Sequence, residues 1–276
     1  MGSFLAFDEG FINYGIFTFA LITTILFQIL SNLANDLGDS IKGTDNSNRL
    51  GPARTVQSGL ISKKQMIRAV IITSILSLLS AGLLVYLSKD NMPLTLIISY
   101  GVLTLFCVAA AILYTISKYA YGYKGFGDLM VLIFFGIVGV LGSYTLYSKE
   151  INPSILFPSI SIGTLSMAVL NLNNLRDHEN DAASGKITLV VQLGFTNAKK
   201  YHFLLIISSF LSLLVFSVLE EKYGVLFAII PCFALIPHLM YVQKCNQPKE
   251  LDSELKKVAL TTFAVSLFTG IGLWII

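Results

Sequence analysis

The chain has 276 residues, of which 54% are hydrophobic and 13% are charged, whereas soluble domains carry about 25% charged residues. This composition excludes an ordinary soluble protein, because too little polar surface is present to cover a core in water. The net charge of +3 is too small to suggest a nucleic-acid partner, and the three cysteines lack disulfide or metal-site spacing. We therefore predict an all-α membrane helix bundle, with residues 1–276 forming a single domain.

Eight apolar runs are long enough to cross a bilayer, which takes about 20 helical residues. In chain order they are Phe11–Ala34, Met66–Leu87, Pro93–Thr115, Leu129–Tyr147, Pro153–Leu175, Phe203–Leu219, Gly224–Val242 and Val258–Ile276. The first ten residues, MGSFLAFDEG, resemble the outer end of an earlier helix. We therefore expect one helix to be missing from the front of the chain.

Basic residues are distributed unequally among the loops between these runs. Of the 19 Lys and Arg residues, the loops after even-numbered runs hold only Lys89, Lys149 and Lys222. The positive-inside rule therefore predicts that the loops after odd-numbered runs face the cytoplasm.

Two acidic clusters lie where the first and fifth runs end, at the start of predicted cytoplasmic loops. The first, in NDLGD, supplies Asn35, Asp36 and Asp39; the second, in NLNNLRDHEND, supplies Asn174, Asp177 and Asp181. Within each cluster the spacing is helical, so these side chains share a face. Oxygen ligands without His or Cys suit a hard cation, usually Mg²⁺, which in proteins often bridges carboxylates to a phosphate.

Basic residues accompany both clusters and suit a diphosphate. They include Lys42, Arg49, Arg54, Lys118, Lys124, Arg176 and Lys186, although we expect Arg176 to point away from the acidic face and to anchor the loop. Acids for a metal, bases for a phosphate and apolar helices for a hydrocarbon tail together favour an enzyme that acts on a lipid diphosphate at the cytoplasmic membrane face. A cation-coupled transporter is the alternative from another class, but it predicts acids in the middle of helices.

Three longer segments carry a resemblance to a known family. NDLGDSIKGTDNSNRLGPARTVQSG (Asn35–Gly59) and LNNLRDHENDAASGKITLVVQLG (Leu172–Gly194) resemble the two aspartate-rich signatures of the UbiA superfamily of intramembrane prenyltransferases. The form of the first, and YTISKYAYGYKGFGDLMVLIFFG (Tyr114–Gly136), are similar to the branch that prenylates 1,4-dihydroxy-2-naphthoate in menaquinone biosynthesis. One departure is that a third aspartate, common in related branches four residues after the second, is Gly43 here, with Asp45 further on.

The resemblance implies a nine-helix bundle and a reaction. A polyprenyl group would pass from a polyprenyl diphosphate to 1,4-dihydroxy-2-naphthoate with loss of carbon dioxide, giving demethylmenaquinol. Another acceptor, such as 4-hydroxybenzoate or homogentisate, is the alternative within the family.

The resemblance also implies roles for individual residues. Magnesium would be held by Asn35, Asp39, Asp177 and Asp181, assisted by Asp36 and Asn174. The diphosphate would be bound by Lys42, Arg54, Lys118 and Lys186.

Four further residues with possible roles lie in or near these motifs. Tyr114 either supports the diphosphate and the allylic cation or is an interfacial aromatic. Asp128 either positions the aromatic substrate or is a helix N-terminal carboxylate. We interpret Tyr123 as a loop-packing or interfacial residue and His178 as a loop residue rather than a ligand.

Overall fold

The computed structural model describes residues 1–46, 49–52 and 54–276, and these form helices and loops without a strand. The α-helices are α1 (Gly2–Asp8), α2 (Tyr14–Lys42), α3 (Lys63–Ser88), α4 (Leu94–Leu113), α5 (Gly127–Val131), α6 (Ser143–Ser148), α7 (Leu156–Ala183), α8 (Leu189–Leu193), α9 (Phe195–Leu219), α10 (Ile229–Cys232), α11 (Leu235–Lys244) and α12 (Asp252–Ile275). A π-helix, η2 (Leu132–Gly142), joins α5 to α6, and short 3-10 turns are η1 (Tyr121–Lys124), η3 (Pro153–Ile155), η4 (Tyr223–Ala228) and η5 (Pro248–Leu251). The predicted all-α membrane bundle is confirmed.

In the described part of the chain, seven continuous spans are long and apolar enough to cross a membrane. An eighth is broken, because Tyr223–Cys232 and Leu235–Lys244 meet at a bend of 45°. The predicted count of eight spans is confirmed if this bent pair is one span. Four predicted boundaries were wrong by six residues or more. Two are starts: α9 begins at Phe195 rather than Phe203, and α12 begins at Asp252 rather than Val258. Two are ends: α2 continues beyond Ala34 to Lys42, and α7 continues beyond Leu175 to Ala183. Both helices run on through their acidic clusters, whose carboxylates find partners described below.

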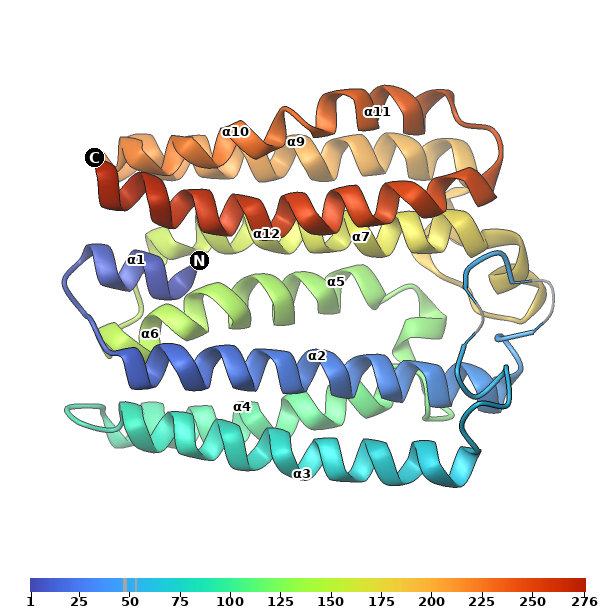
Figure 1. Cartoon of the computed structure of the whole chain (residues 1–276), viewed down its shortest axis with the longest axis horizontal. Helices are drawn as coiled ribbons and strands as arrows, with labels where there is room; N and C mark the ends of the chain where they lie inside the picture. Colours follow the sequence, from blue (N-terminus) through green and yellow to red (C-terminus); the bar gives the residue numbers. More distant parts are fainter. Residues whose placement is uncertain (47–48, 53) are drawn as a thin grey trace.

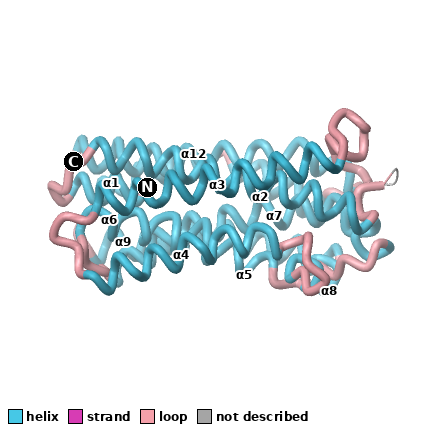
Figure 2. The backbone as a smooth tube through the Cα atoms, turned by 90° about the horizontal axis from the view of Figure 1, so that it is seen from below, coloured by secondary structure: helices cyan, strands magenta, loops and turns pink. Residues whose placement is uncertain are grey.

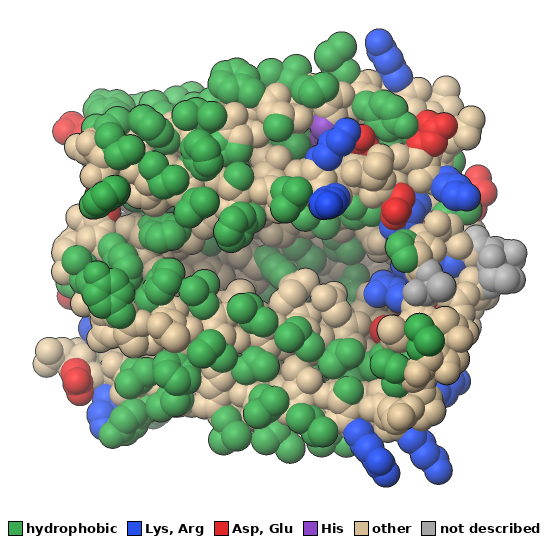
Figure 3. All heavy atoms as spheres, viewed as in Figure 1, with side chains coloured by type: hydrophobic (Ala, Val, Ile, Leu, Met, Phe, Trp, Pro, Cys, Tyr) green, Lys and Arg blue, Asp and Glu red, His purple; other side chains and the backbone are tan. Residues whose placement is uncertain are grey.

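The long helices lie side by side, and the loops gather at the two ends of the bundle (Figures 1 and 2). Many large apolar side chains face outward along the spans, including Ile71, Leu79 and Phe263, as expected where lipid replaces water as the solvent. On the face shown in Figure 3, charged side chains are concentrated at the two ends, above all at the right-hand end, where α2 and α7 finish. This distribution is that of an integral membrane protein with one strongly charged end.

The first ten residues do form a helix and a turn, at the end of the bundle opposite to the acidic clusters (Figure 1). In α1, Leu5 and Ala6 are fully buried, and the helix packs against α6 and α12. Lys222, in the loop after α9, pairs with Asp8 and Glu9. This contact ties the N-terminal turn to the second half of the chain.

The π-helix η2 crosses α7 at close range. A side chain at Gly136 would lie 2.6 Å from the carbonyl oxygen of Ser159 and 2.9 Å from the Cα atom of Gly163. Because neither glycine has a Cβ atom, the two backbones can approach to a distance that other residues would prevent. The crossing holds α5, which starts the same span, against the half of α7 that carries the second acidic cluster.

Candidate active site

The structure brings the two acidic clusters together around Lys186. Its Nζ atom lies 3.1 Å from Asp39 Oδ2 at the end of α2 and 4.0 Å from Asp181 Oδ1 at the end of α7. A second link is the side chain of Asn180, which donates a hydrogen bond of 2.9 Å to the carbonyl oxygen of Thr44. Segments that are far apart in the sequence thus form one site at one end of the bundle.

A left-handed glycine shapes the first half of this site. Gly43 ends α2 with φ of 75°, and the backbone amides of Thr44 and Asp45 then turn back to donate to the carbonyl of Asp39. This turn buries the Asp45 side chain beside the first cluster. Burial raises the pKa of Asp45, the carboxylate of Asp39 adds to the rise, and the guanidinium of Arg49 opposes it.

Tyr123, which we predicted to be a packing residue, is part of the site. Its hydroxyl donates a hydrogen bond of 2.7 Å to Asp39 and lies 2.5 Å from the Thr44 hydroxyl. The ammonium groups of Lys42 and Lys186 lie 4.0 Å and 5.5 Å from the centre of its ring. The packing interpretation is therefore wrong, because the Tyr123 hydroxyl binds a carboxylate while its ring lies near two cations.

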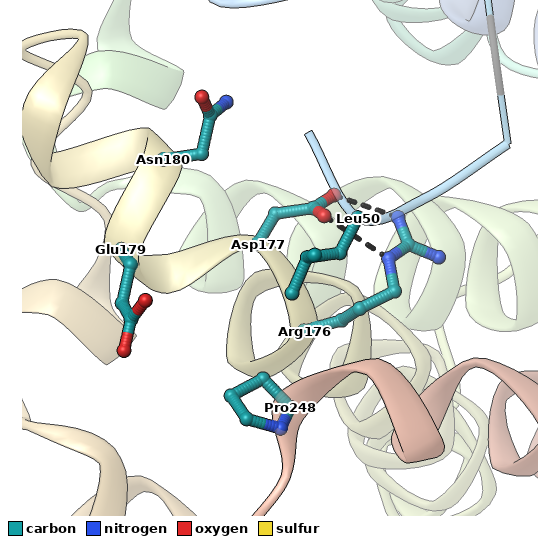
Figure 4. Close-up of a pocket in the computed structure, with 6 residues that line it drawn as sticks. All are labelled: Leu50, Arg176, Asp177, Glu179, Asn180 and Pro248. Carbon is teal, nitrogen blue, oxygen red and sulfur yellow. Dashed lines mark hydrogen bonds and ion pairs between the residues drawn. The ribbon is translucent and has the colours of Figure 1, made fainter. Parts of the chain in front are cut away.

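Asp177, in the second cluster, is already surrounded by donors. It accepts hydrogen bonds from the Arg176 guanidinium at 2.7 and 3.1 Å and from the Gly51 backbone amide at 3.2 Å, and Arg49 lies 3.5 Å away. Figure 4 shows Arg176 turned toward Asp177 while Glu179 points away from it. These residues border a small cavity of about 60 Å³.

Our expectation that Arg176 points away from the acids was wrong. The side chain is 3% exposed and bridges Asp177 to Asp252 on α12. A Cβ atom at Gly51 would overlap this guanidinium, so a larger residue there would require the Arg176 side chain to shift. Helical spacing predicts the direction in which the side chain leaves the helix. It does not predict where the guanidinium at the end of a long arginine side chain lies.

The first cluster and the adjacent Asp45, in contrast, contain buried side-chain oxygens that have no hydrogen-bond partner among the described residues. They are Asn35 Oδ1, Asp36 Oδ1 and both carboxylate oxygens of Asp45, although Asp45 pairs with Arg49 at 3.3 Å. Asp36 Oδ2 accepts a hydrogen bond of 2.6 Å from Thr55. Because buried oxygens without a partner are unfavourable, this donor set fits a hard divalent cation.

A closed metal cage is not preformed in residues 1–46, 49–52 and 54–276, where no three His, Cys, Asp or Glu side chains are arranged to hold one ion. Asn174 is buried beside Asp177, with 4% exposure. The clusters thus supply oxygens on two sides of a site rather than a complete set around one point. That arrangement suits Mg²⁺, which usually keeps waters and takes further ligands from a substrate phosphate.

The predicted diphosphate ligands fall into two groups. Lys42 and Lys186 lie at the acidic clusters, and Arg54 has a buried Nε atom without a hydrogen-bond acceptor in the part of the chain that the structure describes. Lys118, in contrast, is exposed, and its ammonium lies 4.9 Å from the centre of the Tyr119 ring. The structure therefore does not bring Lys118 to the acids.

The charge on Lys186 is secured by its surroundings. Burial by itself lowers the pKa of this ammonium, but the carboxylates of Asp39 and Asp181 outweigh it and raise the pKa above its ordinary value. Lys186 is therefore a permanent cation inside the site, with two anionic neighbours that a metal could relieve.

Tyr114 lies between this charged region and the interior. A side chain at Gly127 would lie 3.2 Å from its hydroxyl, and its ring packs edge-on against Tyr121 with centroids 5.3 Å apart. Burial raises the pKa of Tyr114 to about 12, and the Asp39 and Asp128 carboxylates add to the rise while Lys186 opposes it. The hydroxyl thus stays protonated and can act as a hydrogen-bond donor.

The sequence predicted a packing or interfacial role for Tyr123, no role for Asp45, and a place for Arg49 among the bases that suit a diphosphate, while Arg176 was expected on the wrong side. A signal existed for Asp45, since glycine at 43 is the residue that reverses the chain after a helix. Tyr123 carried no comparable signal, because its position depends on how the loop before α5 folds onto α2.

The sequence is similar to a known protein family and to several of its members. The model of the UbiA prenyltransferase family matches residues 1–273. The chain is 38% identical to a 1,4-dihydroxy-2-naphthoate octaprenyltransferase of Haemophilus influenzae over 97% of this chain and 86% of that protein, and 38% identical to that of Escherichia coli over 100% and 89%. It is also 27% identical to the human UbiA prenyltransferase domain-containing protein 1, over 79% of this chain and 62% of that protein. The chain belongs to the UbiA prenyltransferase family.

Proposed function

We propose that this enzyme transfers a polyprenyl group from a polyprenyl diphosphate to 1,4-dihydroxy-2-naphthoate, with loss of carbon dioxide, in menaquinone biosynthesis. The observation that carries the proposal is the meeting of the two acidic clusters around buried Lys186, next to buried oxygens that have no hydrogen-bond partner within the described residues. The names of the relatives at 38% identity support the same donor class and acceptor. We also propose that residues 1–276 form one catalytic domain.

We propose that the diphosphate lies between the clusters and the basic residues. Asn35, Asp36, Asp39, Asn174, Asp177 and Asp181 would hold Mg²⁺, and Lys42, Arg54 and Lys186 would bind phosphate oxygens. The metal would neutralise the charge that grows on the leaving diphosphate. Lys118 would join only if its ammonium left the Tyr119 ring.

The hydrocarbon tail would lie against apolar helices deeper in the bundle. Figure 3 shows a hollow on this face between α7 and α12 on one side and α2 on the other, with Lys and Arg side chains at its right-hand edge. An apolar hollow beside a charged end matches a substrate with one diphosphate and one hydrocarbon end. Its walls would also keep water from the reactive allylic carbon.

Tyr114 would act at the border between these two parts. Its ring is placed to stabilise positive charge that develops on the allylic carbon, as aromatic faces do for cations. Its protonated hydroxyl can donate a hydrogen bond to a phosphate oxygen or to the acceptor. We propose that this site faces the cytoplasm of a bacterial inner membrane, since the basic loops lie at the same end.

The test is an assay of membranes that contain this chain, supplied with 1,4-dihydroxy-2-naphthoate, a polyprenyl diphosphate and Mg²⁺. We expect demethylmenaquinol and released carbon dioxide, both abolished by a chelator and restored by added Mg²⁺. Parallel reactions with 4-hydroxybenzoate and homogentisate test the acceptor. Product with one of these, and none with 1,4-dihydroxy-2-naphthoate, would reject the acceptor and keep the family chemistry.

A further inference from the structure

Asp128 is a buried carboxylate that the diphosphate chemistry leaves unused. It lies in the first turn of α5 with 4% exposure, and its Oδ1 atom accepts a hydrogen bond of 3.1 Å from the Tyr201 hydroxyl on α9. No basic side chain of the described residues lies within 4.0 Å of it, whereas Asp39, Asp177 and Asp181 each have one. A buried carboxylate without a cation is unfavourable unless it serves a ligand or a proton.

The position of Asp128 relates it to the reaction site through Tyr114. The Tyr114 hydroxyl packs against Gly127, the residue before Asp128, and Leu170 of α7 borders the same point. The Tyr114 hydroxyl also interacts electrostatically with Asp39, Lys186 and Asp128. Tyr114 thus neighbours both the charged groups around Lys186 and the start of α5, where Asp128 lies, and we place the second substrate at the α5 side of Tyr114, within reach of the allylic carbon.

The acceptor in the proposed function needs a base at such a place. Its ring carbon becomes a strong nucleophile when the neighbouring hydroxyl loses a proton, because the oxygen then donates charge to the ring. Lys42 and Lys186 are cations engaged with Asp39 and Tyr123 and cannot accept a proton. The carboxylates of both clusters face cations or the proposed metal position, which leaves Asp128 as the carboxylate that can take the proton.

We propose that Asp128 is the general base of the reaction: it accepts the proton of the acceptor hydroxyl adjacent to the carbon that forms the new bond, and Tyr201 orients it. This inference rests on the proposed function. It deepens that function by assigning the acceptor side of the site to the start of α5 and to α9.

The proton and electron balance closes without a further reagent. The hydroxyl proton moves to Asp128, and the electron pair of the oxygen forms a carbonyl while the ring carbon bonds to the allylic carbon. The bond from that carbon to the diphosphate oxygen breaks, and diphosphate leaves with the pair. The carboxylate on the ring carbon then leaves as carbon dioxide, its bonding pair restores the aromatic ring, and the oxygen takes the proton back from Asp128.

The experiment compares wild type with Asp128→Asn, which keeps an oxygen that Tyr201 can donate to but cannot accept the proton. Two acceptors are used: 1,4-dihydroxy-2-naphthoate and its methyl ether at the hydroxyl next to the carboxylate-bearing carbon. With the natural acceptor, we expect kcat to fall by about 100-fold or more in the variant, the range for loss of a general base, with KM for the prenyl diphosphate unchanged. With the methyl ether, which has no proton to give, wild type and variant should be equally slow.

Asp90→Asn, an exposed residue in the loop after α3, is the matched control and should leave both rates unchanged. Asp128→Glu, which restores a carboxylate, should recover part of kcat and covers the case in which the asparagine variant does not fold. An Asp128→Asn enzyme that keeps wild-type kcat, or an equal loss with both acceptors, would overturn the role of Asp128. A wild-type enzyme that makes no product from 1,4-dihydroxy-2-naphthoate would instead reject the proposed function.

Discussion

The two acidic clusters are alike in sequence spacing but differ in what their oxygens bind. In the first cluster, buried oxygens of Asn35 and Asp36 have no hydrogen-bond partner among the described residues. In the second, Asp177 already accepts from Arg176 and the Gly51 amide and faces Arg49. Lys186 pairs with Asp39 on α2 as well as with Asp181 on α7, so the difference lies elsewhere. On α2, Asn35 and Asp36 offer oxygens to a cation, whereas on α7 the protein's own arginines already occupy Asp177. A divalent cation would find available oxygens at Asn35 and Asp36, whereas its binding to Asp177 would displace an arginine contact.

The largest expected effect is a loss of activity when Asp39, at the end of α2, is replaced. Asp39→Asn should lower kcat by about 1,000-fold, since loss of one electrostatic stabiliser in a dry site typically removes 10²–10³. The measurement is initial rate in detergent or vesicles at saturating Mg²⁺. Glu179→Gln, an exposed acid on α7 that points away from Asp177, is the control and should keep its rate. An equal loss of kcat in the two variants would show that the effect of Asp39→Asn is not specific to the cluster on α2.

The next largest expected effect is a loss of stability when Arg176, on α7, is replaced. Arg176→Met leaves Asp177 buried and lacking its closest cation, so the free energy of unfolding should fall by about 3 kcal/mol, as when one partner of a buried pair is removed. Added Mg²⁺ should restore more stability to this variant than to wild type, because it would replace the lost cation. Thermal unfolding with and without Mg²⁺ measures both effects, with exposed Arg68→Met as the control. An equal Mg²⁺ response in both proteins would contradict the idea that arginine occupies a metal position.

A smaller effect, this time a gain in stability, is expected when Asp45 is replaced. Burial, aided by Asp39, raises the pKa of this carboxyl above its ordinary value, so its ionised form destabilises the folded chain at neutral pH. Asp45→Asn should therefore stabilise the metal-free protein by about 1 kcal/mol, in the range of other relieved charge clashes. The gain should disappear as the pH falls below about 4, where the carboxyl is protonated in both states. Unfolding at several pH values checks this, and a gain that grew on acidification would refute the sign.

The smallest effect is expected at Lys118, outside both clusters. Because the side chain is exposed and lies over the Tyr119 ring, Lys118→Ala should change the free energy of unfolding by less than about 0.5 kcal/mol. We expect KM for the prenyl diphosphate to rise only about threefold, the effect of one exposed charge near a ligand. Lys124→Ala is the matched control, because the Lys124 ammonium lies 5.6 Å from the centre of the same ring. A loss comparable to that of Asp39→Asn would mean that Lys118 moves into the site when substrate binds.

The sequence predicts the spans and the position of the acids, because hydropathy and helical spacing act locally. The eight apolar runs and the placing of Asn35, Asp39, Asp177 and Asp181 on helices depend only on such local patterns. The contacts that connect the two acidic clusters to the rest of the chain could not be predicted from such patterns. Tyr123 reaches Asp39 through a loop fold, and Arg176 reaches Asp252 through a long flexible side chain. Both are tertiary contacts that no periodicity encodes.

Lys186 has a consequence for turnover as well as for binding. Lys186 pairs with Asp39 and Asp181, so the site contains its own counter-ion. When the diphosphate product leaves with its charge, this tethered cation can return to the vacated carboxylates at once. Such a tethered cation would neutralise both carboxylates without an ion from solution.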